Sequence, residues 1–143
     1  MTIKQLSVFA ENRSGGLLDV IHTLGNAAID IRALNVADTQ DFGILRLIVD
    51  DTDKAKSVLT DLGAICAVTE VIGVKIPDIP GGLGSVLTLL AEHNINVDYL
   101  YAFVSVSGSS AYLVLRVQDN DGAIQVLTEA GVDLVTEADI TAL

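Results

Sequence analysis

The sequence predicts an α+β protein made of two tandem ferredoxin-like units, each with the element order βαββαβ. Two observations carry this prediction. One pattern of glycines and apolar residues occurs twice along the 143 residues, and each copy alternates strand-like with helix-like hydrophobic spacing in the same order. Right-handed connections between such elements give a split βαβ layer, an antiparallel sheet with its helices on one face. We expect the two copies at residues 1–70 and 71–143.

The repeat is visible at matching positions in the two halves of the chain. The clearest matches are Gly15-Gly16-Leu17 with Gly81-Gly82-Leu83, Val58-Leu59 with Val126-Leu127, and Gly63 with Gly131. Because these matches occur in the same order, they indicate a duplicated unit rather than chance similarity.

The elements of the first copy follow from periodicity and turn residues. Leu6, Val8 and Ala10 alternate with more exposed positions, which predicts a first strand. The next elements are a helix over 17–28 and strands over 30–36 and 42–49. A helix capped by Asp51 or Thr52 and ended by Gly63 follows, and a strand over 65–69 closes the copy.

The second copy repeats this order. Its strands are expected at residues 72–76, 96–104, 111–117 and 134–139. The apolar faces of its two helices are Leu83, Val86, Leu87 and Leu90, and then Ala123, Val126, Leu127 and Ala130. The spacing in both helices places these residues on one side, toward the sheet.

Composition excludes several classes of protein. Eight basic and 19 acidic residues give a formal charge of −11, which disfavours a nucleic-acid partner because phosphate contacts need clustered Lys and Arg. A hydrophobic share of 50% and a mean hydropathy of +0.53 exclude a disordered chain. The start of the sequence carries no signal-peptide pattern, and the uncharged run over 99–115 is too short and too polar to span a membrane. We expect a cytoplasmic protein without a membrane partner.

The residues that could support catalysis, metal binding or cofactor binding do not form a site. Cys66 has no CxxC partner and is expected to be a small buried hydrophobe. His22 and His93 have no ligand-spaced acid, His or Cys that recurs in both copies. The stretch that begins at Gly82 lacks the third glycine of a dinucleotide fingerprint. We therefore expect no enzyme activity, no metal and no cofactor.

The turn after the first strand of each copy is the recurring polar feature. It reads Asn12-Arg13-Ser14-Gly15-Gly16-Leu17 and then Asp78-Ile79-Pro80-Gly81-Gly82-Leu83. Glycines at a helix N-terminus leave backbone N–H groups that favour an anion such as a carboxylate, and Asn12 or Asp78 could accept from an ammonium. The alternative is purely structural: Asn or Asp caps the turn, and Gly supplies a positive φ.

These turns, taken with the repeated element order, resemble the ACT domain, a regulatory module that senses small molecules. The resemblance covers essentially the whole chain as two copies, and it implies that a free amino acid binds between paired domains near the βα turns. The implied ligand residues, with the turn amides, are Asn12, Gly15, Gly16, Leu17 and Asp30 in the first copy and Asp78, Gly81, Gly82, Leu83 and Asn96 in the second.

The sequence departs from the family at two points. Ser14 stands where the turn usually has Pro, which Pro80 retains, and Ala10 and Ile76 are apolar where the first strand often has a polar residue. The second departure removes a contact found in serine-sensing relatives, so serine specificity is not expected.

The sequence is compatible with two functions. The first is a non-catalytic regulatory protein that binds a free amino acid. The alternative is a regulatory subunit that controls an amino-acid-biosynthetic enzyme by protein contact, as the small subunit of acetolactate synthase does. A two-layer fold leaves one face of each sheet open, and apolar residues are expected there at Phe9, Ile44, Ile48, Tyr112 and Val114. We therefore expect at least a homodimer.

Overall fold

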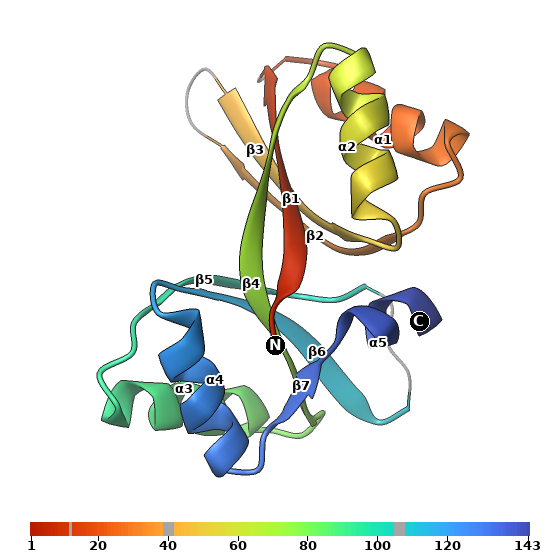
Figure 1. Cartoon of the computed structure of the whole chain (residues 1–143). Coiled ribbons are helices and arrows are strands. Elements are labelled where there is room, and N and C mark those ends of the chain that lie inside the picture. Colours follow the sequence, from red (N-terminus) through yellow and green to blue (C-terminus); the bar gives the residue numbers. More distant parts are fainter. Residues whose placement is uncertain (12, 39–41, 105–107) are drawn as a thin grey trace. The chain divides into compact units, whose positions relative to one another are not determined.

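A computed structural model describes residues 1–11, 13–38, 42–104 and 108–143 of the chain (Figure 1). The chain forms two compact units. The N-terminal unit is Lys4–Thr69, and the C-terminal unit is Glu70–Leu143 together with Met1–Ile3. The first three residues are therefore part of the unit that is otherwise built from the second half of the sequence.

The N-terminal unit has the element order βαββαβ. Its elements are β1 (Ile3–Glu11), α1 (Gly16–Asn26), β2 (Ile31–Asp38), β3 (Phe42–Val49), α2 (Thr52–Asp61) and the first residues of β4 (Ile65–Pro77). The strand order is β2-β3-β1-β4, and β3 pairs antiparallel with both of its neighbours. In this register Leu47 lies opposite Leu6 on one side and Leu34 on the other.

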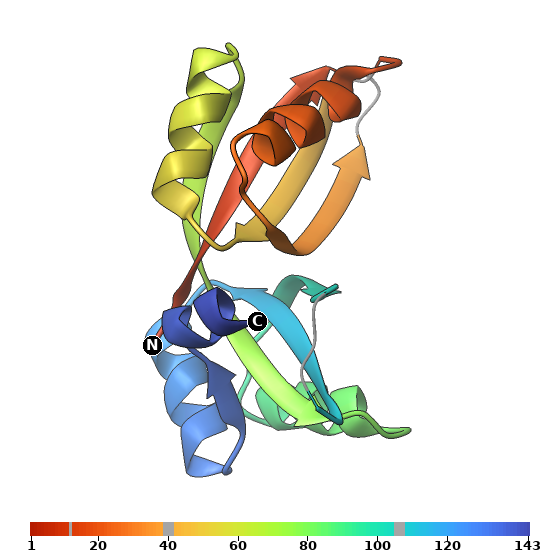
Figure 2. The same cartoon turned by 90° about the vertical axis from the view of Figure 1, so that its right-hand side faces the viewer.

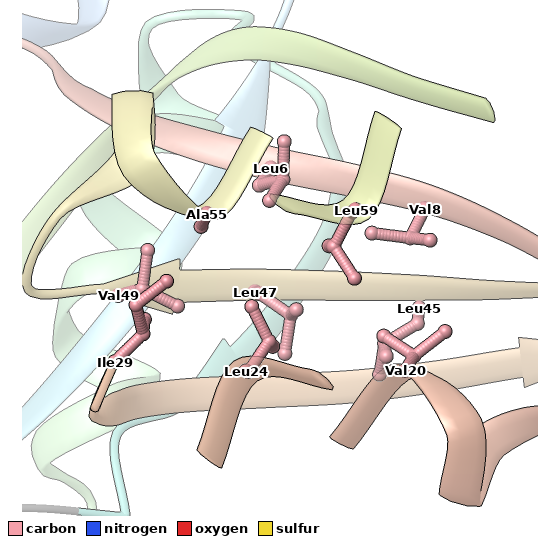
Figure 3. Packing of buried hydrophobic residues seen from close by; sticks show 10 residues of the cluster. All are labelled: Leu6, Val8, Val20, Leu24, Ile29, Leu45, Leu47, Val49, Ala55 and Leu59. Atoms are coloured by element: carbon pink, nitrogen blue, oxygen red, sulfur yellow. The ribbon is translucent and has the colours of Figure 1, made fainter. Parts of the chain in front are cut away.

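Both helices of this unit cover the same face of its sheet (Figure 2). Val20 and Leu24 of α1 and Ala55 and Leu59 of α2 point toward apolar residues of the strands, as Figure 3 shows. The strand side of this core is Leu6, Val8, Leu45, Leu47 and Val49. These residues recur at every second position, so one face of β1 and β3 is apolar and packed.

The C-terminal unit repeats this arrangement and adds one helix. Its elements are the remainder of β4, α3 (Gly82–Glu92), β5 (Val97–Ala102), β6 (Ser110–Val117), α4 (Asn120–Glu129), β7 (Asp133–Val135) and α5 (Glu137–Ala142). The strand order is β5-β6-β4-β7. The core contains Val86 and Leu90 of α3, Ala123 and Leu127 of α4, and the strand residues Ile72, Val74, Ile76, Leu113, Leu115 and Val117. The predicted α+β fold with two βαββαβ repeats is confirmed.

Several element boundaries differ from the prediction. The strands expected at 65–69 and 72–76 are one continuous strand, β4. Helix α1 ends at Asn26 rather than at residue 28, because Ala28 takes a left-handed conformation with a φ of 57°. The equivalent residue of the second copy, Asn94, has the same φ.

The strand expected over 134–139 is wrong beyond Val135. Thr136 starts α5 through a capping box, in which its hydroxyl accepts from the Asp139 N–H at 3.1 Å and the Asp139 carboxylate accepts from the Thr136 N–H at 2.8 Å. Reciprocal capping satisfies two backbone donors at once, so it favours a helix here over a longer strand.

Helix α5 lies against the face of the sheet opposite α3 and α4. The Lys75 ammonium is 3.1 Å from the Asp139 carboxylate of α5, and Lys75 alternates along β4 with the core residues Val74 and Ile76. The same ammonium lies 5.7 Å from the centre of the Tyr112 ring. This helix was not expected from the sequence.

The faces expected to be open are only partly exposed. Phe9 is 42% exposed and Ile44 is half-buried, but Ile48 and Val114 are fully buried and Tyr112 nearly so. No helix in the described parts of the chain is long and apolar enough to cross a membrane.

A candidate ligand site at the strand–helix turns

The two βα turns have the same backbone geometry. Gly15 and Gly81 precede α1 and α3 with φ values of 83° and 84°, a left-handed conformation that glycine adopts without steric cost. A tight backbone hydrogen bond precedes each of them, from Arg13 to the Glu11 carbonyl at 2.8 Å and from Ile79 to the Pro77 carbonyl at 2.9 Å.

The second glycine of each pair is required by close backbone approach. A Cβ on Gly16 would lie 2.6 Å from the Glu11 carbonyl oxygen, and a Cβ on Gly82 would lie 2.6 Å from that of Pro77. The N–H groups of Gly16 and Gly82 donate to carbonyls within the turn, each at 3.1 Å. The geometry of the turn alone therefore explains why Gly16 and Gly82 are glycines. Their backbone N–H groups already have acceptors and are not available to a ligand.

The next amides of each helix are available. Among the described residues, the N–H groups of Leu17 and Leu18 in α1, and of Leu83 and Gly84 in α3, have no hydrogen-bond acceptor. They lie in the first helical turn, where the partial positive charge of the helix favours an anion. Of the predicted donors, Leu17 and Leu83 therefore fit a carboxylate best.

A cavity adjoins each turn, at equivalent places in the two copies. In the C-terminal unit it has a volume of about 500 Å³ and lies between the end of β4, the start of α3 and the turn from α4 to β7. In the N-terminal unit it has a volume of about 320 Å³ and lies between the end of β1, the start of α1 and the turn from α2 to β4. Both fall in the range of about 300–1,000 Å³ that is typical of small-molecule sites.

The cavity of the C-terminal unit has an aliphatic lining with a few polar groups. Its apolar residues are Ile76, Pro77, Ile79, Pro80, Val86 and Val132, and its polar side chains are Lys75, Ser85 and Asp133. The Ser85 hydroxyl donates to the Gly81 carbonyl at 3.1 Å, and Lys75 pairs with Asp139. The Asp133 carboxylate makes no hydrogen bond or ion pair with any residue that the structure describes.

The cavity of the N-terminal unit is dominated by charge. The Arg13 guanidinium donates to the Glu11 carboxylate at 3.1 Å, to the Asp19 carboxylate at 3.2 Å and to the Ser14 carbonyl at 3.2 Å. All three charged side chains are more than half exposed, so these ion pairs contribute little to stability. They do hold the arginine across the start of α1.

The predicted polar residues of the turns are placed unequally. Asn12 lies outside the described residues. Asp78 is exposed, and its backbone N–H donates to the Ser109 carbonyl at 3.2 Å. Its carboxylate has no partner among the described residues, which leaves it available to an ammonium group.

Asp30 and Asn96 lie at the other end of the first helix of their unit. Since α1 has 11 residues, its two ends are separated by about 16 Å. The Asp30 carboxylate accepts from Arg32 at 2.5 Å, and its backbone N–H donates to Asp50 at 3.0 Å. Asn96 donates to Asp98 at 3.1 Å. Within one unit, the structure does not bring these residues to the turn.

Sequence reasoning missed the residues that close the cavity from the opposite side. Gly131, Val132 and Asp133 follow α4, and they reach the turn only because β7 pairs with β4 beside it. The recurrence of Gly63 and Gly131 was the available signal, since both end a helix at this place with a positive φ.

The environment of Cys66 does not activate its thiol. Burial raises the pKa of the Cys66 thiol, and the charge of Lys56 lowers it by less, so the thiol stays protonated and poorly nucleophilic. No group of three or more His, Cys, Asp or Glu in the described parts of the chain could hold a metal ion.

The repeated βαββαβ units and their glycine turns agree with the comparisons to known proteins. The family model of the ACT domain pair matches residues 1–143, and the chain belongs to this family. It is an ACT domain pair, the kind of module found in the regulatory parts of proteins.

Solved structures give the same result. Protein BT0572 from Bacteroides thetaiotaomicron is 39% identical, with a TM-score of 0.92 over 100% of this chain and 98% of that one. The regulatory subunit of aspartate kinase from Thermus thermophilus has a TM-score of 0.63, and the match covers 89% of this chain and 91% of that one. Its sequence identity is 13%, so this likeness shows the shared fold alone. No protein of curated function matches the sequence.

Proposed function

We propose that this chain is a non-catalytic regulatory protein that binds a free amino acid at the turns between β1 and α1 and between β4 and α3. The observation that supports this most directly is the combination of unpartnered amides at Leu83 and Gly84 with the adjoining cavity. Helix-terminal amides suit an α-carboxylate, and an unpaired carboxylate suits an α-ammonium.

In this proposal the two charged groups of the ligand have separate partners. The amides of Leu83 and Gly84 hold the carboxylate, and Asp78 or Asp133 holds the ammonium. Asp30 and Asn96 are too far from the turn of their own unit, so we place them at a site completed by a second copy of the chain. This requires a homodimer, with ligand binding favouring one assembly over another.

Binding is tested by isothermal titration calorimetry with the twenty common amino acids at millimolar concentration. At least one is expected to bind, and its N-acetyl and methyl-ester derivatives are expected not to bind, because each lacks one of the two charges. Asp78→Asn is expected to weaken binding with no change in the unfolding midpoint. If none of the twenty amino acids binds, the proposed function is wrong.

The alternative is a regulatory subunit of an amino-acid-biosynthetic enzyme. It is supported by the aspartate kinase regulatory subunits from Thermus thermophilus and Thermus flavus, which match over 91% and 92% of their own lengths at 13% and 12% identity. Affinity purification from native extract decides between the two. A stable, stoichiometric enzyme partner favours the subunit, whereas self-association without a partner favours the free-standing sensor.

A further inference from the structure

The two turn cavities occupy equivalent positions but differ in their chemistry. Ile76, Ile79 and Val86 of the C-terminal cavity correspond to Ala10, Arg13 and Val20 of the N-terminal one. The largest difference between the two cavities is therefore that the C-terminal one has the aliphatic side chain of Ile79 where the N-terminal one has the guanidinium of Arg13.

Arg13 closes the N-terminal turn to a ligand. Its guanidinium lies 3.8 Å from the point where a Cβ of Gly15 would be, and its Cγ lies 3.6 Å from that of Gly16. The side chain thus lies along the glycines, and Glu11 and Asp19 hold it there at 3.1 and 3.2 Å. A carboxylate at the start of α1 would meet the carboxylate of Asp19 in the first helical turn.

The C-terminal turn lacks all of these obstacles. Ser85 replaces Asp19, Pro77 replaces Glu11, and α3 has no acidic residue in its first turn. The cavity is also larger, about 500 Å³ against about 320 Å³, and aliphatic side chains form most of its lining. An apolar group packed against Ile76, Ile79 and Val132 is removed from water, whereas a polar group there would lose hydrogen bonds to water that these three side chains do not replace.

We propose that the two copies have diverged, so that the turn of the C-terminal unit alone binds the ligand, and that this ligand is an amino acid with an aliphatic side chain. This inference rests on the proposed function: it narrows the two proposed turns to one and adds the class of amino acid that binds there. The side chain of the ligand packs against Ile76, Ile79 and Val132, and Asp133 lies at the polar rim.

Calorimetry with valine, leucine, isoleucine, serine and aspartate tests the selectivity. The affinity for an aliphatic amino acid is expected to exceed that for serine or aspartate by a factor of about 10 or more, because each methylene group buried in an apolar pocket contributes this much. One molecule is expected to bind per chain. Preferential binding of serine or aspartate, or two equivalent sites per chain, overturns this inference and leaves the proposed function standing. Absence of binding by all twenty common amino acids overturns both.

A reciprocal exchange tests the location. Ile79→Arg is expected to weaken binding of the aliphatic amino acid by a factor of about 10 or more, whereas Arg13→Ile is expected to leave the affinity of the C-terminal turn unchanged. Ile79 is 63% exposed, so both variants are expected to fold, and their urea midpoints check this. Ile79→Leu, which keeps the apolar lining, is expected to retain the affinity. Unchanged binding by Ile79→Arg, or equal losses from both exchanges, excludes the C-terminal turn as the site.

Discussion

Single residues of the turns are fixed by backbone crowding rather than by a ligand. Gly82→Ala would place a methyl group 2.6 Å from the Pro77 carbonyl oxygen. We predict a loss of about 1–3 kcal/mol in the free energy of unfolding, measured by urea denaturation, because the backbone must move to relieve the overlap. Gly84→Ala is the matched control, since no heavy atom lies within 4 Å of its Cβ position in the same helix.

The control is expected to change stability in the opposite direction. Alanine within a helix is more stable than glycine by about 0.5–1 kcal/mol, so Gly84→Ala should raise the urea midpoint. Equal effects of the two substitutions would mean that Gly82 is not required by the approach of the Pro77 carbonyl.

Ala28 takes a backbone conformation that alanine rarely adopts. Its φ of 57° lies in the left-handed region just after α1, where glycine or asparagine is usual, and the equivalent residue in the second copy is Asn94. We predict that Ala28→Asn and Ala28→Gly stabilise the protein by up to about 1 kcal/mol in thermal or urea unfolding. Ala91→Gly, within α3, is expected to cost about 1 kcal/mol. Destabilisation by both Ala28 variants would contradict this account.

Residue patterns predicted the positions of both turns, and the ligand residues remain a prediction. The glycine pairs, which recur as Gly15-Gly16 and Gly81-Gly82, identified both helix starts. The residue pattern alone did not show that the amides of Gly16 and Gly82 donate within the turn, or that Asp133 lines the same cavity as Gly82. The turn hydrogen bonds of Gly16 and Gly82 join residues three positions apart, whereas the place of Asp133 depends on the pairing of β7 with β4, which brings together residues distant in sequence.

At the scale of elements, α5 depends on one carboxylate. The pKa of Asp139 lies below its ordinary value, chiefly because the backbone N–H of Thr136 donates to it, and the hydrogen bond from Lys75 adds to this effect. A carboxyl whose pKa falls on folding stabilises the folded state above its unfolded-state pKa, about 3.9 for aspartate. That stabilisation is lost as the pH falls through the lowered value.

We therefore predict that Asp139→Asn lowers the free energy of unfolding at neutral pH and has a smaller effect at about pH 3, where part of this stabilisation is lost. Urea denaturation at the two pH values measures the difference. Asp133→Asn is the control, because this carboxylate has no partner among the described residues, and its effect should not depend on pH in this way. A pH-independent loss in Asp139→Asn would show that the charge of Asp139 does not stabilise α5.

The missed helix shows where repeat symmetry misleads. Val135-Thr136-Glu137 matches Val68-Thr69-Glu70, which lies in strand β4, so symmetry between the copies favours a strand here. The capping pattern from Thr136 to Asp139 was present in the sequence and indicated a helix. The helix forms because Thr136 and Asp139 each accept a hydrogen bond from the backbone N–H of the other.

At the scale of the whole molecule, an exposed apolar face favours self-association, and a large net charge opposes it. Phe9 and Ile44 lie opposite each other on β1 and β3, and Phe42 lies on the same face, opposite the helices of the N-terminal unit. Phe9 and Phe42 are 42% and 54% exposed. The charge of −11 on each chain opposes association through this face.

We predict a homodimer whose association strengthens with salt. Raising the ionic strength from about 0.01 to 0.15 M shortens the screening length from about 30 to 8 Å, which weakens the repulsion between acidic chains. Phe42→Asp is expected to shift the equilibrium toward monomer in analytical ultracentrifugation. Leu18→Asp adds the same charge on α1 and should shift it less, because Leu18 lies on the helix side. A monomer at millimolar concentration in high salt would contradict the prediction.

Ile3 makes the C-terminal unit discontinuous in sequence. A Cβ on Gly73 would meet the Ile3 side chain at 3.1 Å and that of Val135 at 2.7 Å, and Thr2 donates to Glu70, 68 positions away, at 3.3 Å. The N-terminal unit, by contrast, is the single continuous segment Lys4–Thr69. Because contacts between residues distant in sequence slow folding, we expect the N-terminal unit to gain hydrogen-exchange protection before the C-terminal unit during refolding.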